Sequence, residues 1–149
     1  MRRFPDVPPV WWLASIALIF VFKLIAPGLH PDIWWLDAIS WLVCAGALGV
    51  AGWSAWFFFN RKTPIEPHRT PKTLIVEGPY RLSRNPIYLA LVLLTLASAM
   101  GHGSVLGLIL TGVLWVVLDR RFAAPEEALL RQTFGTAADA YIARTRRWI

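Results

Sequence analysis

The sequence predicts an all-α integral membrane protein with about four transmembrane helices and a cytoplasmic C-terminal helical segment. The 149 residues are 56% hydrophobic with a mean hydropathy of +0.51, and only 16% are charged, against about 25% in ordinary soluble domains. The charged residues lie between long apolar blocks rather than throughout the chain. We expect a single membrane domain over residues 1–149, with an N-terminal two-helix hairpin over 1–59 and a second half over 60–149.

The positive charges predict the topology. The chain has 15 Lys and Arg residues against 9 Asp and Glu, and nearly all of the basic ones precede the first apolar run, follow the last run or lie in the central polar segment. Segments rich in Lys and Arg stay in the cytoplasm during insertion. We therefore expect both termini and residues 60–85 to be cytoplasmic, with the inner membrane as the location in a bacterial cell. The net charge of +6 then reflects topology and does not indicate a nucleic acid partner.

Two apolar runs make up the first half. The first, residues 10–26, just reaches the length of about 17 residues that spans a bilayer as a helix. A cleaved signal peptide is the competing interpretation, but the run is long and no small-x-small cleavage pattern follows it. The second run, residues 33–59, carries Trp residues towards both ends, as interfacial aromatic belts do. Its Gly46, Gly49 and Gly52 predict a surface on which another helix packs closely.

The third and fourth runs, residues 87–100 and 105–118, are short. With flanking residues, 82–101 and 102–121, each reaches the required length of about 20 residues. They predict a tight helical hairpin, with His102 in its turn. We expect His102, like His30 in the earlier loop, to be solvated. The single cysteine, Cys44, permits no intramolecular disulfide, and no metal site is expected.

Two predicted helix starts on the cytoplasmic side suggest a site. Asn85 stands at an N-cap position with Pro86 at the first helical position, and the positive end of this helix, with Arg84 beside it, suits a carboxylate or phosphate. Pro125 followed by Glu126 and Glu127 predicts a second helix start. An anion site beside a cation site suits a zwitterion such as an amino acid moiety. Helix capping explains the same residues. On spacing alone, a capped helix with interfacial arginines is the preferred interpretation of the start at Asn85, and spacing does not show that the two starts meet.

Two separated stretches, LIVEGPYRLSRNPIYLA and EEALLRQTFGTAADAYIARTRRWI, carry a family resemblance. They are similar to the isoprenylcysteine carboxyl methyltransferases and the related membrane phospholipid methyltransferases. The family pattern is met, in order, by Leu74, Ile75, Gly78, Tyr80, Arg84, Pro86, Tyr88, Glu126, Glu127, Leu130, Phe134, Gly135 and Tyr141. The resemblance covers about residues 64–149. Asn85 replaces the usual His, so the position cannot titrate, and Ala90 replaces the usual Gly.

The resemblance implies an S-adenosylmethionine-dependent methyltransferase without a Rossmann domain, and the chain has no GxGxxG motif. Glu126 would engage the methionyl ammonium of the cofactor. Arg84 and the helix start would hold its carboxylate, and Arg84 and Glu127 are the expected catalytic residues. The rest of the implied cofactor contacts are Lys72, Thr73, Leu74, Ile75, Tyr80, Asn85, Pro86, Ile87 and Tyr88.

The implied partners are membrane lipids and a lipophilic methyl acceptor that enters from the bilayer, with O-methyl transfer to a carboxylate favoured. In-line methyl transfer mainly requires positioning of the acceptor. A carboxylate acceptor needs no general base, whereas an ammonium must first lose a proton. Glu127, His68 and Tyr141 are the candidate bases, each of which also has a structural interpretation.

Two alternatives come from other classes. An NADPH-dependent membrane reductase of the sterol reductase type shares an Arg-His-Pro-x-Tyr element. A non-catalytic membrane scaffold requires no ligand site at all. A channel is disfavoured because no apolar run carries a regular polar stripe.

Overall fold

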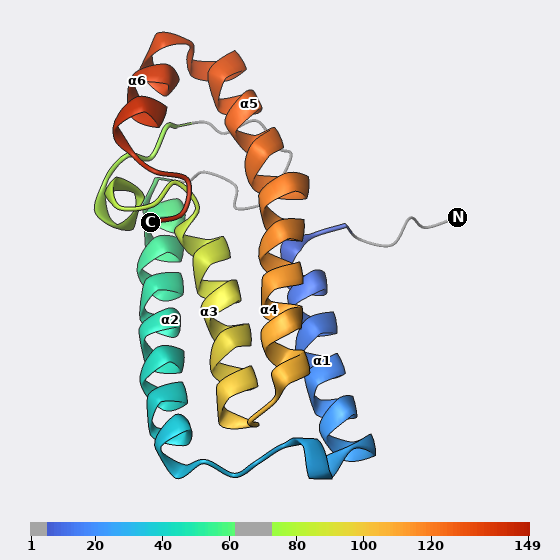
Figure 1. Cartoon of the computed structure of the whole chain (residues 1–149). Helices are drawn as coiled ribbons and strands as arrows, with labels where there is room; N and C mark the ends of the chain where they lie inside the picture. The colour runs from blue at the N-terminus through green and yellow to red at the C-terminus, as the bar shows by residue number, and fades with distance from the viewer. Residues whose placement is uncertain (1–5, 62–72) are drawn as a thin grey trace.

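All regular structure in the computed structural model is helical within residues 6–61 and 73–149, the part of the chain that it describes (Figure 1). The all-α prediction is therefore confirmed for these residues. The helices are α1 (Pro8–Ile25), α2 (Trp34–Asn60), α3 (Pro86–Gly101), α4 (Val105–Leu118), α5 (Ala124–Phe134) and α6 (Thr136–Arg144). Short 3-10 turns, η1 (Pro27–Leu29) and η2 (Gly78–Arg81), and a π-helical segment, η3 (Asp119–Ala123), lie between them.

The four long helices run up and down, with α3 packed against α2, α4 and α1, and α1 packed also on α4 (Figure 1). The expected hairpin over residues 1–59 is not a packed pair, since α1 and α2 lie mainly against other helices. The reason is the difference between the two connections. The α3–α4 turn is tight, while the α1–α2 link passes beneath it, so closely that a Cβ at Gly103 would lie 2.4 Å from the carbonyl oxygen of Pro31.

Small residues form the contact surface of α2, but they are not the small residues that the sequence predicted. The buried residues of α2 are Ser40, Ala47 and Ser54, spaced by seven, and this helix packs on α3. The glycines at 46, 49 and 52 face open space, with nothing within 4 Å of an added Cβ. The prediction that they receive another helix is wrong within the described chain, because the seven-residue series occupies the packed face instead.

The surface of α1 and α2 is that of a membrane protein. Both helices are long and apolar enough to cross a bilayer, and only 17% and 11% of their most apolar windows are buried. Side chains such as Leu24, Trp34 and Leu42 are at least 74% exposed. Apolar area of this extent is stable only against lipid or a partner. Helices α3 and α4 have 16 and 14 residues, so by length only α1 and α2 are candidate spans and the expected count of four is not confirmed.

The two loop histidines are less solvated than expected. His30 is buried, and its Nδ1 lies 2.9 Å from the carbonyl oxygen of Ala26. His102 follows the last residue of α3, with its Nδ1 2.7 Å from the Ser98 carbonyl and its ring edge-on to Phe20 at 4.6 Å. Each ring satisfies a carbonyl at a helix end, which explains why both rings turn towards the protein.

The α3–α4 contact predicts the effect of adding a methyl group to α4. A Cβ at Gly107 would lie 2.7 Å from the Cβ of Ala99, whereas a Cβ at Gly112 in the same helix meets nothing within 4 Å. Overpacking of this kind costs about 1–3 kcal/mol. We expect Gly107→Ala to lower the thermal unfolding midpoint in detergent, while the matched Gly112→Ala leaves it unchanged or raises it. Equal midpoints for the two variants would contradict the close contact.

Candidate functional site

Helix α3 starts at the predicted residue, but the polar groups around this start bind the C-terminal segment of the chain. Asn85 is the N-cap residue and Pro86 the first helical residue, which confirms the predicted start. The side chain of Asn85 does not cap the helix and donates instead to the carbonyl of Arg147 at 3.3 Å. The Ser83 hydroxyl donates to the same carbonyl at 3.1 Å, and the backbone amide of Arg84 donates to the carbonyl of Arg146 at 3.0 Å. Residues 145–149, called the tail below, therefore lie against the loop that leads into the helix start expected to hold an anion.

Glu126 and Glu127 do not begin a separate helix. The backbone keeps helical dihedrals through Leu118 and Ala123, so α4, η3 and α5 form one continuous rod (Figure 1). The predicted start at Pro125 coincides with the first turn of α5, which contains both acids, but this turn continues the preceding helix. A proline inside an α-helix clashes with the carbonyl four residues earlier, and the wider π turn just before it relieves that clash.

The π segment also sets which residues share a face. In a regular α-helix, two residues eight positions apart lie about 80° apart around the axis. A π turn holds about one residue more than an α turn, so the same two residues behave as if seven apart, about 20° from alignment. This register places Asp119 and Glu127 on one face of the rod, where both reach Arg147.

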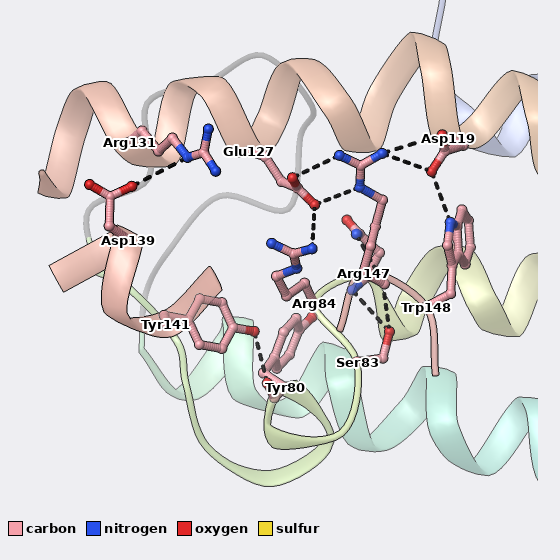
Figure 2. A network of polar contacts seen from close by, with 11 residues as sticks. Tyr80, Ser83, Arg84, Asp119, Glu127, Arg131, Asp139, Tyr141, Arg147 and Trp148 are labelled. Carbon is pink, nitrogen blue, oxygen red and sulfur yellow. Dashed lines mark hydrogen bonds and ion pairs between the residues drawn. The ribbon is translucent and has the colours of Figure 1, made fainter. Parts of the chain in front are cut away.

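Glu127 is the centre of a polar network at this end of the molecule (Figure 2). Its buried carboxylate accepts two hydrogen bonds from Arg147, at 2.6 Å from Nε and 2.8 Å from Nη2, and lies 3.2 Å from Nη2 of Arg84. Nη1 of Arg147 donates to both oxygens of Asp119 at 3.2 and 3.3 Å, and the indole of Trp148 donates to Asp119 at 2.8 Å. The hydrogen bond to Glu127 raises the pKa of Arg147.

Arg84 has unused donors in this network. Its side chain is only 11% exposed, and Nε and Nη1 find no hydrogen-bond partner in the part of the chain that the structure describes. Burial lowers the pKa of this guanidinium, while the charge of Glu127 raises it. Buried donors without a partner are costly, and an oxyanion placed against them would form charge-assisted hydrogen bonds.

Glu126 faces a different neighbour from Glu127. It accepts a hydrogen bond from the hydroxyl of Tyr88 on α3, and burial raises its pKa from an ordinary 4.5 to about 7 although that hydrogen bond opposes the shift. Tyr80 is buried nearby in η2 and is held in place by Tyr141, whose hydroxyl donates to the Tyr80 carbonyl at 2.8 Å (Figure 2). The site thus combines a partly buried acid, Glu126, with the largely buried guanidinium of Arg84 on adjoining elements.

The other expected cofactor residues differ in how deeply they are buried. Ile75 and Pro86 are buried and Leu74 is half-buried, whereas Thr73 is exposed. Ile87 packs against the apolar cluster that includes Tyr88 and Phe122. Lys72 lies outside the described residues, as does the candidate base His68.

Sequence reasoning missed the three residues that complete the network, Asp119, Arg147 and Trp148. The arginines of the tail resemble interfacial anchors in the sequence, and no local spacing relates 147 to 119 and 127. Only the return of the chain after α6 brings the tail beneath α5 (Figures 1 and 2). Arg147 turns inward to the two carboxylates and not out towards lipid head groups.

Comparison with known proteins gives two findings. A family model described as phospholipid methyltransferase matches residues 34–137, which include α2 to α5 and end before the tail. A solved structure, that of the eukaryotic intramembrane Ras methyltransferase ICMT (isoprenylcysteine carboxyl methyltransferase), is similar with a TM-score of 0.72 over 97% of this chain at 19% identity. The chain spans about half of that protein, 52% of its length. Because the identity is only 19%, the likeness shows a shared fold and no more. Curated protein sequences give no significant match.

The raised pKa of Glu126 predicts a pH-dependent stability. Between pH 4.5 and about 7 the folded chain keeps a proton on Glu126 that an exposed carboxyl releases. The folded state then binds more protons than the unfolded state, so stability falls as the pH rises through this window. We expect the unfolding midpoint of Glu126→Gln to fall less between pH 5 and 7 than that of the parent. Glu77→Gln, which alters an exposed acid, should keep the parental dependence. Identical pH profiles for the parent and Glu126→Gln would contradict the buried acid.

Proposed function

Because the chain belongs to the phospholipid methyltransferase family, we propose that it is an integral membrane methyltransferase that uses S-adenosylmethionine and acts on a lipophilic acceptor. The observation that carries this proposal is an acid and a basic side chain of low exposure on adjoining elements: the carboxyl of Glu126 and the unpartnered donors of Arg84. A methionyl group is a zwitterion, with an ammonium and a carboxylate on one carbon. The donor set therefore suits this part of the cofactor.

Each side chain has a distinct task in the proposed mechanism. Glu126 binds the ammonium, with the Tyr88 hydroxyl holding one of its oxygens, and Arg84 binds the carboxylate through Nε and Nη1. When bound, S-adenosylmethionine supplies a methyl group on a sulfonium sulfur, open to in-line attack. Tyr80 and Tyr88 are aromatic and buried, which suits them to pack against the adenine or the sulfonium.

The acceptor is proposed to be a carboxylate on a lipophilic molecule. Transfer then forms an oxygen–carbon bond while the carbon–sulfur bond breaks, and no proton has to leave the acceptor. This agrees with the surroundings of Glu127, whose two oxygens both accept from Arg147 and are thus poorly placed to take a proton. We therefore propose that Glu127 orients Arg84 and does not act as a base. A phospholipid amine is the second candidate acceptor, because the family description names phospholipids.

We also propose the four-span topology, with the termini and the site in the cytoplasm. The starts of α1 and α3 and the end of α4 lie at one end of the bundle, and Arg121 forms an ion pair with Asp6 at 2.8 Å across it. The hairpin of α3 and α4 lies alongside the two long apolar helices. In this arrangement the acceptor approaches from the bilayer and the cofactor from the aqueous side.

Cofactor binding is the first test. We expect saturable binding of S-adenosylmethionine and S-adenosylhomocysteine to the purified, detergent-solubilised protein by calorimetry. Glu126→Gln and Arg84→Ala should weaken it by about tenfold or more, as expected when a charge-assisted contact of roughly 1.5–3 kcal/mol is lost. Glu77→Gln, at an exposed acid, is the matched control and should bind normally.

The same experiment separates the rival functions. A reductase predicts stabilisation by NADPH in place of S-adenosylhomocysteine. A scaffold predicts no binding, with Glu126→Gln and Arg84→Ala indistinguishable from the parent. A folded parent that binds neither methyl donor nor product overturns the methyltransferase proposal.

The acceptor class has its own test. With a labelled methyl donor, we expect transfer to a prenylated cysteine carboxylate in detergent micelles to exceed transfer to the same head group on a short, soluble thioether. Phosphatidylethanolamine vesicles form the third arm and test the amine alternative. Equal rates on the soluble and lipophilic carboxylates would contradict entry from the bilayer, and labelling of phosphatidylethanolamine alone would replace the carboxylate by an amine.

A further inference from the structure

We propose that the tail supports this site and that Arg147 and Asp119 are positioning residues for Arg84. The inference rests on the proposed function and concerns a segment that lies beyond residues 34–137, where the family model matches. It assigns a role to two residues that the sequence pattern does not single out.

The tail is fixed first through its backbone. The carbonyls of residues 146 and 147 accept from the Arg84 amide, the Ser83 hydroxyl and the Asn85 side chain, at 3.0, 3.1 and 3.3 Å. Some sixty residues separate the two segments, since the Ser83 contact alone spans 64 positions. The loop that carries Arg84 is therefore held by the tail and not by its own helix cap.

The tail is fixed a second time through its side chains. The guanidinium of Arg147 bridges Glu127 and Asp119, and the indole of Trp148 also binds Asp119 (Figure 2). The ring of Trp148 lies 5.9 Å from that of Trp115 on α4. One short segment thus ties the rod of α4, η3 and α5 to the start of α3.

These contacts fix the position of the Arg84 side chain. Nη2 of Arg84 contacts the same oxygen of Glu127, Oε1, that accepts from Nε of Arg147. Arg147 holds Glu127 through two parallel hydrogen bonds, a geometry that fixes the plane of a carboxylate and that Lys cannot reproduce. With Oε1 held, Nη2 of Arg84 is anchored, and its Nε and Nη1 are left to face a ligand carboxylate.

The test compares ligand affinity with stability in the full-length, detergent-solubilised protein. S-Adenosylhomocysteine is titrated into the parent, Arg147→Lys and Asp119→Asn, and the unfolding midpoint of each is measured. Asp119→Asn leaves the Glu127 pair in place and provides a second variant if Arg147→Lys fails to fold. The matched control is Arg120→Lys, the same substitution at an exposed arginine next to Asp119. We expect the two test variants to weaken binding by about tenfold, a coupling of ordinary size between residues of one network, and the control to leave it unchanged.

A double-mutant cycle separates positioning from a merely structural role. If Arg147 acts through Arg84, Arg147→Lys has no further effect on affinity once Arg84→Ala is present. A loss of the same factor in both backgrounds, or a lower midpoint with unchanged affinity, would overturn this proposal and leave the proposed function standing. Failure of the folded parent to bind at all would overturn the proposed function and this inference with it.

Discussion

The carboxylate of Glu127 is shared between the guanidinium groups of Arg84 and Arg147, and one end of the protein is assembled around it. A buried carboxylate is stable only when it is paired and hydrogen-bonded, so this residue demands both partners. One partner comes from the loop before α3 and the other from the tail. Three segments that are distant in the sequence are therefore held together by a single acid, and Asp119 balances the second positive charge.

The π segment makes this convergence possible. Without its extra residue, Asp119 and Glu127 would point in different directions and Arg147 could not bridge them. The segment stands where the apolar α4 gives way to the polar α5, so it sets the rotation of Glu126 and Glu127 relative to the helix bundle. Such insertions are frequent at functional sites. Here the insertion places Glu127 against Arg147 of the tail and Glu126 against Tyr88.

The helix bundle below the site obeys a different constraint, the scarcity of water. Its buried hydroxyls turn back to the carbonyl four residues earlier, as Ser54, Thr95 and Thr111 do at 2.6 to 3.0 Å. Polar groups in a membrane must be satisfied within the protein, and a hydroxyl bonded to its own helix meets that requirement. Apolar side chains are thus free to cover the outer faces of α1 and α2, while small residues bring α2, α3 and α4 together.

The sequence by itself determined the positions of the helices and the membrane environment around them. Apolar runs, proline positions and basic segments predicted α1 to α4 to within a few residues, the start of α3 at Pro86, and a membrane environment, because these depend on local composition and periodicity. The motif residues likewise directed attention to Arg84, Glu126 and Glu127. Tertiary structure alone decided which helices are neighbours, since α1 packs on α4 and α3 and the glycines of α2 remain open. It also decided that Glu127 binds the tail while Glu126 binds Tyr88. These pairings join residues that are 20 and 38 positions apart, and they depend on one inserted residue in the rod. Local sequence spacing cannot predict them, because they form only when the chain folds back on itself.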